Sequence, residues 1–252
     1  MDKLERALEK VRQQRGTVAP RPIEKNGASS PLTSGKVTIS ETQLERSRII
    51  ANRTRSAEAD LFRILRTQVL QAMNKSNFKT LAITSPNYGE GKTTIALNLA
   101  ISIALDLKQT VLLADLDLRK PGIHTFLGIR PEHGLTDYLL HNTPLPDCML
   151  RLSFDRLTLL PAGNPLENSS ETLASPKMAA LVHDLKSRYP DRFIIYDMPP
   201  ILAQDDPIAF LPHVDAVLLV VQDGVTRTAA IKRCLGALEH ANIIGTVLNN
   251  AV

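Results

Sequence analysis

The chain has 252 residues, of which 43% are hydrophobic and 22% are charged, ordinary values for a globular protein of one or two domains. Aromatic residues make up only 4% and tryptophan is absent, which argues against a base-stacking surface for nucleic acid. The two cysteines, Cys148 and Cys234, exclude a disulfide scaffold and a four-cysteine zinc site, and we expect both to be buried, reduced thiols. Because the first ten residues are charged, no signal peptide is expected. The sequence also has no run of 18 apolar residues, the length that would be needed to span a membrane.

Charge is distributed unevenly along the chain. Residues 1–80 carry 16 Lys and Arg against 8 Asp and Glu, whereas residues 81–252 carry 14 against 18. A basic region of this kind can attract nucleic acid, an anionic membrane surface or an acidic protein, or it can be simply a solvated tail. The charge alone does not decide between these alternatives.

The first fifty residues are expected to lie outside the main domain. Residues 1–15 predict a short amphipathic helix, because apolar side chains recur at helical spacing. These apolar positions are Leu4, Ala7, Leu8 and Val11. Residues 16–50 predict a flexible linker, because Pro, Gly, Ser and Thr are frequent up to residue 40. Such a short helix is marginal alone, so it either docks on a partner or is a frayed tail. Residues 51–252 are assigned to one domain.

Helical and apolar stretches alternate from residue 56 onward. The first predicted helix covers residues 56–73, with a packing stripe at Leu61, Leu65 and Val69. The predicted strands are 80–84, 110–114, 157–160, 193–196, 216–221 and 242–248, and the further predicted helices are 92–106, 176–187 and 227–239. The strands are apolar throughout, which is typical of strands covered on both faces. The predicted fold class is therefore α/β, with a mostly parallel sheet flanked by helices on both faces.

A glycine-containing loop, SPNYGEGKTT (residues 85–94), joins the first strand to the following helix, where a phosphate-binding loop is expected. Gly89 and Gly91 allow backbone N–H groups to approach phosphate oxygens, and the helix N-terminus favours negative charge. Lys92, at the exposed end of the loop, is predicted to neutralise phosphate charge, and the Thr93 hydroxyl to ligate Mg²⁺. The predicted ATP-binding residues of the loop are Asn87, Tyr88, Gly89, Glu90, Gly91, Lys92, Thr93 and Thr94.

Three carboxylates follow predicted strands. Asp115 and Asp117 come at the end of the second strand in VLLADLDLR, and Asp197 ends a later strand in FIIYDMPP. Ligands of open α/β sheets bind at the carboxyl ends of the strands, so these side chains are expected at the ligand edge. A strand that ends in Asp suits a carboxylate that organises Mg²⁺.

The three motifs, in this order, resemble the bacterial tyrosine kinases of capsule and exopolysaccharide synthesis, a branch of the deviant-Walker P-loop ATPases. Those proteins carry S-P-x-x-G-E-G-K-[ST], hhhDxDxR and hhhDxxP, and the likeness covers residues 55–252. Septum-site and partition ATPases of the wider group usually have a second lysine early in the loop. This chain has Asn87 there, which favours the kinase branch. The resemblance implies a P-loop NTPase fold with ATP and Mg²⁺ as cofactors.

The resemblance also implies roles in catalysis. Lys92 and the loop amides would hold the phosphates. The implied Mg²⁺ ligands are Thr93, Asp115 and Asp197. Either Asp115 or Asp117 would accept the proton of the substrate tyrosine hydroxyl, and the resemblance favours Asp115.

Two further features are implied by the resemblance. Asp60, Arg63 and Arg66 share one helix face where the family has E-x-x-R-x-x-R for subunit pairing; the alternative is a solvated face. Asn249 follows the last strand, where the wider group often places a residue that contacts adenine, and a simple strand-end turn is equally expected.

The expected function is an ATP-dependent protein-tyrosine kinase-like activity in exopolysaccharide or capsule polymerisation and export. The expected protein is a cytoplasmic homo-oligomer, held at the inner face of the membrane by a chain-length determinant or activator protein, and no nucleic acid is expected. The final residues, VLNNAV, lack the tyrosine cluster that ends autophosphorylating members, so a non-kinase ATPase switch for complex assembly is the alternative. A partition or septum-placement ATPase is a third hypothesis, motivated by the basic first 80 residues.

Overall fold

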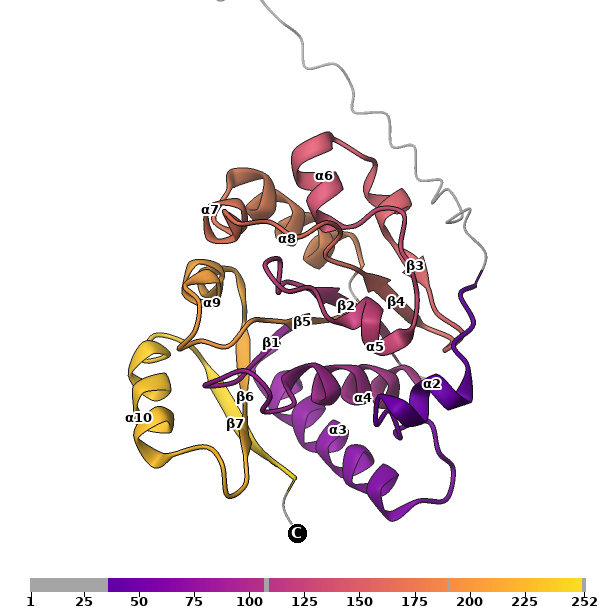
Figure 1. Ribbon diagram of the computed structural model, residues 1–252, viewed down its shortest axis with the longest axis vertical. Coiled ribbons are helices and arrows are strands. Elements are labelled where there is room, and N and C mark those ends of the chain that lie inside the picture. The colour runs from indigo at the N-terminus through magenta and orange to yellow at the C-terminus, as the bar shows by residue number, and fades with distance from the viewer. Residues whose placement is uncertain (1–35, 107–108, 190, 251–252) are drawn as a thin grey trace, which may run out of the picture. The chain divides into compact units, whose positions relative to one another are not determined.

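The computed structural model describes residues 36–106, 109–189 and 191–250. Its centre is a seven-stranded sheet of order β3-β4-β2-β5-β1-β6-β7 (Figure 1). The strands are β1 Thr80–Thr84, β2 Thr110–Asp115, β3 Leu150–Arg151, β4 Leu157–Leu160, β5 Arg192–Asp197, β6 Ala216–Gln222 and β7 Ile243–Asn249. Every neighbouring pair is parallel except β3 with β4. The predicted α/β fold with a mostly parallel sheet is therefore confirmed.

The helices cover both faces of this sheet (Figure 1). They are α2 Glu41–Arg46, α3 Ala57–Lys75, α4 Lys92–Ala104, α5 Ile123–Leu127, α6 Leu135–His141, α7 Ser169–Leu173, α8 Pro176–Arg188, α9 Asp206–Phe210 and α10 Thr228–Ala237, with the 3₁₀ turns η1 Leu145–Cys148 and η2 Leu211–His213. The four predicted helices correspond to α3, α4, α8 and α10. Two of them begin at serine caps, since the hydroxyls of Ser56 and Ser175 accept hydrogen bonds from backbone N–H groups of the first turn.

Each central strand contributes side chains alternately to two separate cores. In β1, Leu81 and Ile83 belong to the core under α3 and α4, whereas Ala82 belongs to the core under α8 and α10. The same alternation holds in β2, where Leu113 lies on the α4 side and Leu112 on the other. Successive side chains of a strand point to opposite faces, so uniformly apolar strands supply both cores. This explains the continuous hydrophobic runs in the sequence.

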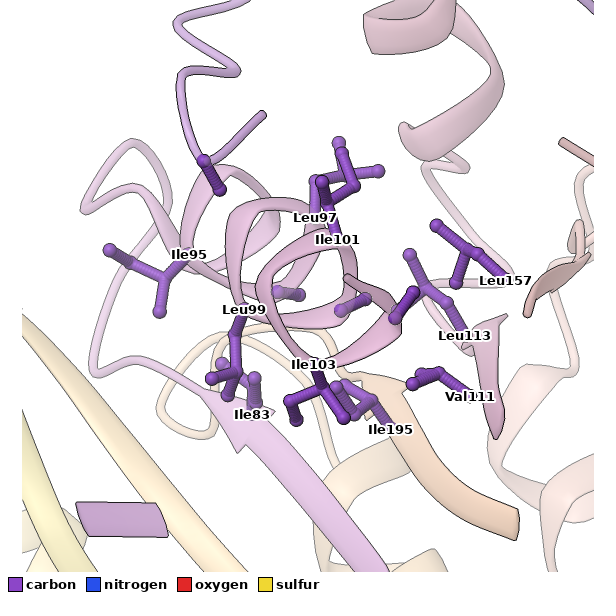
Figure 2. Close-up of a cluster of buried hydrophobic side chains, with 14 of the residues drawn as sticks. Ile83, Ile95, Leu97, Leu99, Ile101, Ile103, Val111, Leu113, Leu157 and Ile195 are labelled. Atoms are coloured by element: carbon purple, nitrogen blue, oxygen red, sulfur yellow. The ribbon is translucent and has the colours of Figure 1, made fainter. Parts of the chain in front are cut away.

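Helix α4 is buried nearly all round. Figure 2 shows the side chains of Ile83, Leu113 and Ile195, from three adjacent strands, gathered against it. On its outer side α3 packs over it, and the Ser102 hydroxyl donates a hydrogen bond to the Phe62 carbonyl. A helix held from several sides has little freedom to shift. Its first residue is therefore held at a constant place beside the end of β1.

The linker predicted for residues 16–50 is wrong over residues 36–50. Val37 forms a parallel bridge with Leu152, and α2 begins at Ser40, whose hydroxyl accepts a hydrogen bond from a backbone N–H of its first turn. Three apolar side chains of this stretch are buried: Ile39, Leu44 and Ile49. The prediction rested on the Pro and Ser content before residue 40 and underweighted these apolar residues. The predicted helix 1–15 and the rest of the linker lie outside the described residues.

The predicted packing stripe of α3 is also partly wrong. Val69 is buried, but Leu61 is 65% exposed and Ile64 is 55% exposed. Residues spaced by four advance about 40° per step around a helix, so Leu61 and Val69 are about 80° apart. The buried face instead contains Ala59, Val69 and Met73. Leu61 and Ile64 are left as an exposed apolar pair on α3.

Both cysteines are free and buried, as predicted. Burial raises the pKa of each thiol to about 11, which keeps them protonated and unreactive at neutral pH. Among the described residues no helix combines the length and the apolar content that a bilayer crossing requires.

Asp215 connects the starts of two strands to α8. Its Oδ2 accepts hydrogen bonds from the backbone N–H groups of Lys79 and Thr80 at 2.9 and 3.0 Å, and its Oδ1 accepts one from Lys186 Nζ at 2.6 Å. Burial alone would raise the pKa of Asp215, but these hydrogen bonds outweigh burial and lower the pKa below its ordinary value.

We expect Asp215→Asn to lower the free energy of unfolding by about 1 to 3 kcal/mol at pH 7, because hydrogen bonds to a charged acceptor are lost. A lowered carboxyl pKa stabilises the fold above the pKa of the unfolded chain, and this contribution disappears as the pH falls through the folded pKa. Urea denaturation at pH 7 and near pH 3 should therefore show a smaller difference between variant and wild type at the lower pH. An equal difference at both values would show that the charge of Asp215 is not responsible.

Candidate functional site

The loop after β1 is held open by two glycines and by one buried glutamate. Gly89 and Gly91 have φ of +82° and +91°, the left-handed region that favours glycine. Glu90 is 2% exposed, and its carboxylate accepts hydrogen bonds from the backbone N–H and the side-chain amide of Asn87 and from the Thr226 hydroxyl. The side chains of Asn87 and Glu90, both predicted to bind ATP, are thus engaged in shaping the loop.

Strand register brings two carboxylates together at the carboxyl edge of the sheet. Asp115 of β2 and Asp197 of β5 are Cα partners in the parallel ladder, and they are 0% and 1% exposed. Asp197 Oδ2 accepts a hydrogen bond from the Thr93 hydroxyl at 2.7 Å. Asp115 Oδ2 accepts hydrogen bonds from the backbone N–H groups of Gly122 and Ile123, both at 3.0 Å. One carboxylate therefore faces the first turn of α4, and the other holds the loop after β2.

The sequence predicted Lys92 at the exposed end of the loop, and this prediction is wrong. Lys92 instead lies between carboxylates. Its Nζ is 3.2 Å from Asp117 Oδ2 and 4.0 Å from Asp197 Oδ1, and its side chain is only 12% exposed. Burial alone would lower the pKa of Lys92, but the charges of Asp197, Asp117 and Asp115 outweigh burial and raise it. Lys92 therefore stays protonated and is the counter-ion of the cluster.

The two buried carboxyls are harder to ionise than ordinary ones. Burial, together with the charge of Asp197, raises the pKa of Asp115 to about 7, although backbone hydrogen bonds oppose this. Burial also raises the pKa of Asp197, against the charge of Lys92 and the hydrogen bond from Thr93. Two like charges in a buried site disfavour joint ionisation, and Lys92 is a single cation among the three carboxylates Asp115, Asp117 and Asp197.

The donor set of this cluster fits a magnesium ion. Asp197 Oδ1 is buried and accepts no hydrogen bond from any residue that the structure describes, and the Thr93 hydroxyl lies on the neighbouring oxygen of the same carboxylate. Carboxylate and hydroxyl oxygens are the ligands that Mg²⁺ prefers. Thr93 and Asp197 could hold the ion directly, with Asp115 beside them.

A cavity of about 470 Å³ opens in front of the loop. The predicted site residues that line it are Tyr88, Gly89, Gly91, Lys92, Thr93, Thr94, Asp117 and Asn249. Asn249 Nδ2 donates a hydrogen bond to the Glu90 carbonyl at 3.0 Å. A Cβ at Gly91 would lie 2.1 Å from Asn249 Nδ2, so only glycine permits this contact between loop and β7.

Part of the cavity wall comes from residues that were not predicted to belong to the site. Arg46, Ser47 and Arg48 line the cavity beside the loop, and Lys120 and Phe126 do so from the segment after β2. The first three fall in the stretch that was predicted to be a linker. The available signal was a pair of arginines two residues apart, Arg46 and Arg48, at the end of a short helix.

Asp60, Arg63 and Arg66 do not join this cavity. Arg66 Nη1 donates a hydrogen bond to the Ser102 carbonyl at 2.9 Å, which attaches α3 to α4. Arg63 forms an ion pair with Asp60 and donates a hydrogen bond to the Arg53 carbonyl at 2.9 Å. These groups therefore have partners within the chain.

Comparison with known proteins agrees with the geometry. A family profile described as an AAA domain matches residues 78–242. Tyrosine-protein kinase YwqD of Bacillus subtilis (strain 168) is 31% identical over 210 residues, which are 82% of this chain and 87% of YwqD. The chain belongs to the bacterial tyrosine kinase family of P-loop ATPases. The family is associated with capsule and exopolysaccharide biosynthesis.

Two further family members show how much of a relative the chain covers. The succinoglycan biosynthesis transport protein ExoP of Rhizobium meliloti (strain 1021) is 31% identical over 208 residues, which are 81% of this chain but 26% of ExoP. The chain thus spans about a quarter of that relative. The crystal structure of the chimerical protein CapA2B2 aligns with a TM-score of 0.76 at 29% identity, over 85% of this chain and 92% of that one.

We expect Lys92→Met to destabilise the ligand-free protein by about 3 kcal/mol, because it leaves buried carboxylates without their counter-ion. Addition of MgCl₂ should then raise the melting temperature of this variant more than that of the wild type, because the cation replaces the lost charge. Thermal denaturation with and without Mg²⁺ measures both effects. Lys232→Met, which removes an exposed lysine on α10, is the control and should change neither. An unchanged melting temperature for Lys92→Met would refute the role of Lys92 as counter-ion.

Proposed function

We propose that this protein is an ATP-dependent protein-tyrosine kinase that acts in capsule or exopolysaccharide polymerisation and export. The observation that carries the proposal is the convergence of Lys92, Thr93 and Asp117 on one cavity at the carboxyl edge of the sheet, with Asp197 hydrogen-bonded to the Thr93 hydroxyl. Phosphoryl transfer depends chiefly on positioning and on neutralisation of charge. The cluster offers a lysine, a hydroxyl, carboxylates and a helix N-terminus for these tasks.

The loop and Lys92 would bind the phosphates of ATP. Gly89 has free space where a Cβ would stand, so backbone N–H groups there can approach an anion closely. Lys92 can exchange Asp117 for phosphate oxygens without moving away from the loop. Thr93 and Asp197 would hold Mg²⁺, and the ion would neutralise charge that develops on the transferred phosphoryl group.

The geometry favours Asp117 as the group that accepts the tyrosine hydroxyl proton. Asp117 lines the cavity and contacts Lys92. Asp115 does not line the cavity. Its two carboxylate oxygens accept hydrogen bonds from the backbone N–H groups of Asp117, Gly122 and Ile123. The resemblance had favoured Asp115 for this role. We assign Asp115 instead to holding the loop that carries Asp117, beside the metal.

The test of this proposal is incubation with labelled ATP and a tyrosine-bearing copolymer of Glu and Tyr. We expect tyrosine phosphorylation by the wild type, and a rate lower by a factor of about 10² or more for Asp117→Asn and Asp197→Asn. The affinity for ATP should fall much less, because these carboxylates act on the reacting groups. Asp191→Asn, an exposed residue before β5, is the matched control.

The alternatives give different results in the same experiment. ATP hydrolysis without tyrosine phosphorylation would support the non-kinase switch. Absence of both ATP binding and turnover in the folded wild type would overturn the nucleotide site altogether.

We also propose a cytoplasmic location at the inner face of the membrane, through a membrane chain-length determinant or activator protein. The similarity to the chimerical protein CapA2B2 and to the transport protein ExoP supports this proposal. Residues 1–15 remain our candidate for the docking helix.

The exposed face of α3 supports the further proposal of a homo-oligomer. Leu61 and Ile64 are 65% and 55% exposed, and the ion pair of Asp60 with Arg63 lies on the same helix. An apolar pair beside charged groups is common at subunit contacts. Arg66 already donates a hydrogen bond to the Ser102 carbonyl within the chain. The apolar pair, Leu61 and Ile64, is therefore the main surface on α3 that a neighbouring subunit could cover.

We expect the double variant Leu61→Asp, Ile64→Asp to shift the protein from an oligomer toward a monomer, with a dissociation constant at least about tenfold weaker, because charges would be buried without partners. Light scattering after size-exclusion chromatography measures the mass. Leu235→Asp, at a 44% exposed leucine of α10, should leave the mass unchanged. A monomeric wild type, or an unchanged oligomer in the double variant, is incompatible with this interface.

A further inference from the structure

Two arginines that precede the P-loop ATPase motifs lie on the wall of the nucleotide cavity. Residues 46–48, here named the α2 turn, are the last residue of α2 and the two residues after it, and they line the same cavity as Lys92 and Thr94. Helix α2 itself lies beside α5, as Figure 1 shows. None of the three motifs includes this turn.

The α2 turn is attached to the helix that carries the phosphate-binding lysine. Asn98, fully buried on α4, accepts hydrogen bonds from the backbone N–H groups of Ile50 and Ala51 at 2.8 and 3.0 Å. Its Nδ2 donates to the carbonyls of Arg48 and Thr94, at 3.0 and 2.9 Å. One side chain thus joins the backbone of the α2 turn to the first turn of α4.

A second attachment runs to the segment after β2. The Ser47 hydroxyl donates a hydrogen bond to the Phe126 carbonyl at 2.6 Å, and Gln43 Nε2 donates to the same carbonyl at 2.9 Å. Phe126 belongs to α5, and Ile123, the first residue of the same helix, donates a backbone hydrogen bond to Asp115. The turn therefore bridges the two segments that hold the candidate phosphate and metal ligands.

Arg48 occupies a backbone position where glycine is the usual residue. Its φ is +54°, and α2 ends with hydrogen bonds from Arg48 N–H to the Glu45 carbonyl and from Ile49 N–H to the Leu44 carbonyl. This pattern is a Schellman motif, whose left-handed position is most often Gly and sometimes Asn. An arginine there is disfavoured by its backbone angle, so the turn itself gives no reason for an arginine at this position.

The charge of the cavity indicates what that side chain does. Four cationic residues and one carboxylate line it: Arg46, Arg48, Lys92, Lys120 and Asp117. Asp117 already pairs with Lys92, and Lys120 lies over the ring of Tyr88 at 4.6 Å. The surplus of positive charge therefore comes from the two arginines and Lys120. Both arginines are exposed, and in the described part of the chain neither side chain forms an ion pair.

We propose that Arg48, assisted by Arg46, binds the polyphosphate of ATP from outside the P-loop. The inference rests on the proposed nucleotide site and adds a cation that the motifs do not contain. A guanidinium has five N–H donors and matches phosphate oxygens in bidentate geometry. Because Asn98 holds the backbone of the turn against the turn of α4 that carries Thr94, the backbone of Arg48 is in place before the nucleotide arrives, which lowers the entropic cost of binding.

The test compares Arg48→Gly with wild type, with Arg48→Lys and with Arg55→Ala as the control, by calorimetric titration with ATP, ADP and AMP in the presence of Mg²⁺. Glycine suits the φ of residue 48, so the melting temperature of Arg48→Gly should be no lower than that of the wild type. Its affinity for ATP and ADP should nevertheless fall by a factor of about 10 or more, and that for AMP by much less. Arg48→Lys should retain part of the affinity. Arg55, exposed in the same segment, should be dispensable.

Each outcome decides the proposal. A stable Arg48→Gly variant with weakened ATP binding supports it, whereas unchanged ATP affinity overturns it. An equal loss for AMP and ATP overturns the assignment to the polyphosphate. If the folded wild type binds no nucleotide, the proposed function itself fails, and this inference with it.

Discussion

The pairing of β2 with β5 places two carboxylates, Asp115 and Asp197, side by side at a buried edge of the sheet. Both pKa values are raised, chiefly by burial, to which the charge of Asp197 adds for Asp115 and the charge of Asp117 adds for Asp197. What makes the pair tolerable is its surroundings: backbone N–H groups on Asp115, and Thr93 and Lys92 on Asp197. Lys92 is a single cation among three carboxylates, so a divalent cation bound beside Asp197 would offset negative charge that the lysine leaves uncompensated.

Helix α4 connects the hydrophobic core to this edge of the sheet, because it is buried in the core and begins at Lys92. Its apolar side chains contact the sheet on one side and α3 on the other, so the residues of its first turn are presented at a constant position. Asn98, one turn further along the helix, then holds the segment before α3 against the same place. The candidate phosphate loop, the carboxylates Asp115 and Asp197 and the α2 turn are consequently organised around one buried helix, which suits chemistry that depends on positioning.

Much of the fold followed from the sequence, because strands covered on both faces must be apolar at every position. The uniform run FIIY therefore predicted β5, and the helical spacing of apolar residues between 56 and 73 predicted α3. Strand register could not be predicted, since it is set by tertiary packing, and so neither could the pairing of Asp115 with Asp197. Residues 36–50 were predicted to be a linker, but they fold onto the domain. The error arose because three isolated apolar residues stabilise such a segment only when they pack on a core that is distant in the sequence. The burial of Lys92 was not predicted either, because its carboxylate partners, Asp117 and Asp197, are distant in the sequence.

The most direct test of this account is a crystal structure with Mn²⁺ and a non-hydrolysable ATP analogue, with anomalous diffraction used to locate the metal. The account predicts a single metal peak bound by the Thr93 hydroxyl and adjacent to the Asp197 carboxylate, with Lys92 moved from Asp117 to the phosphates. A metal peak remote from Asp197, or a nucleotide outside the cavity that Lys92 and Thr94 line, would contradict it.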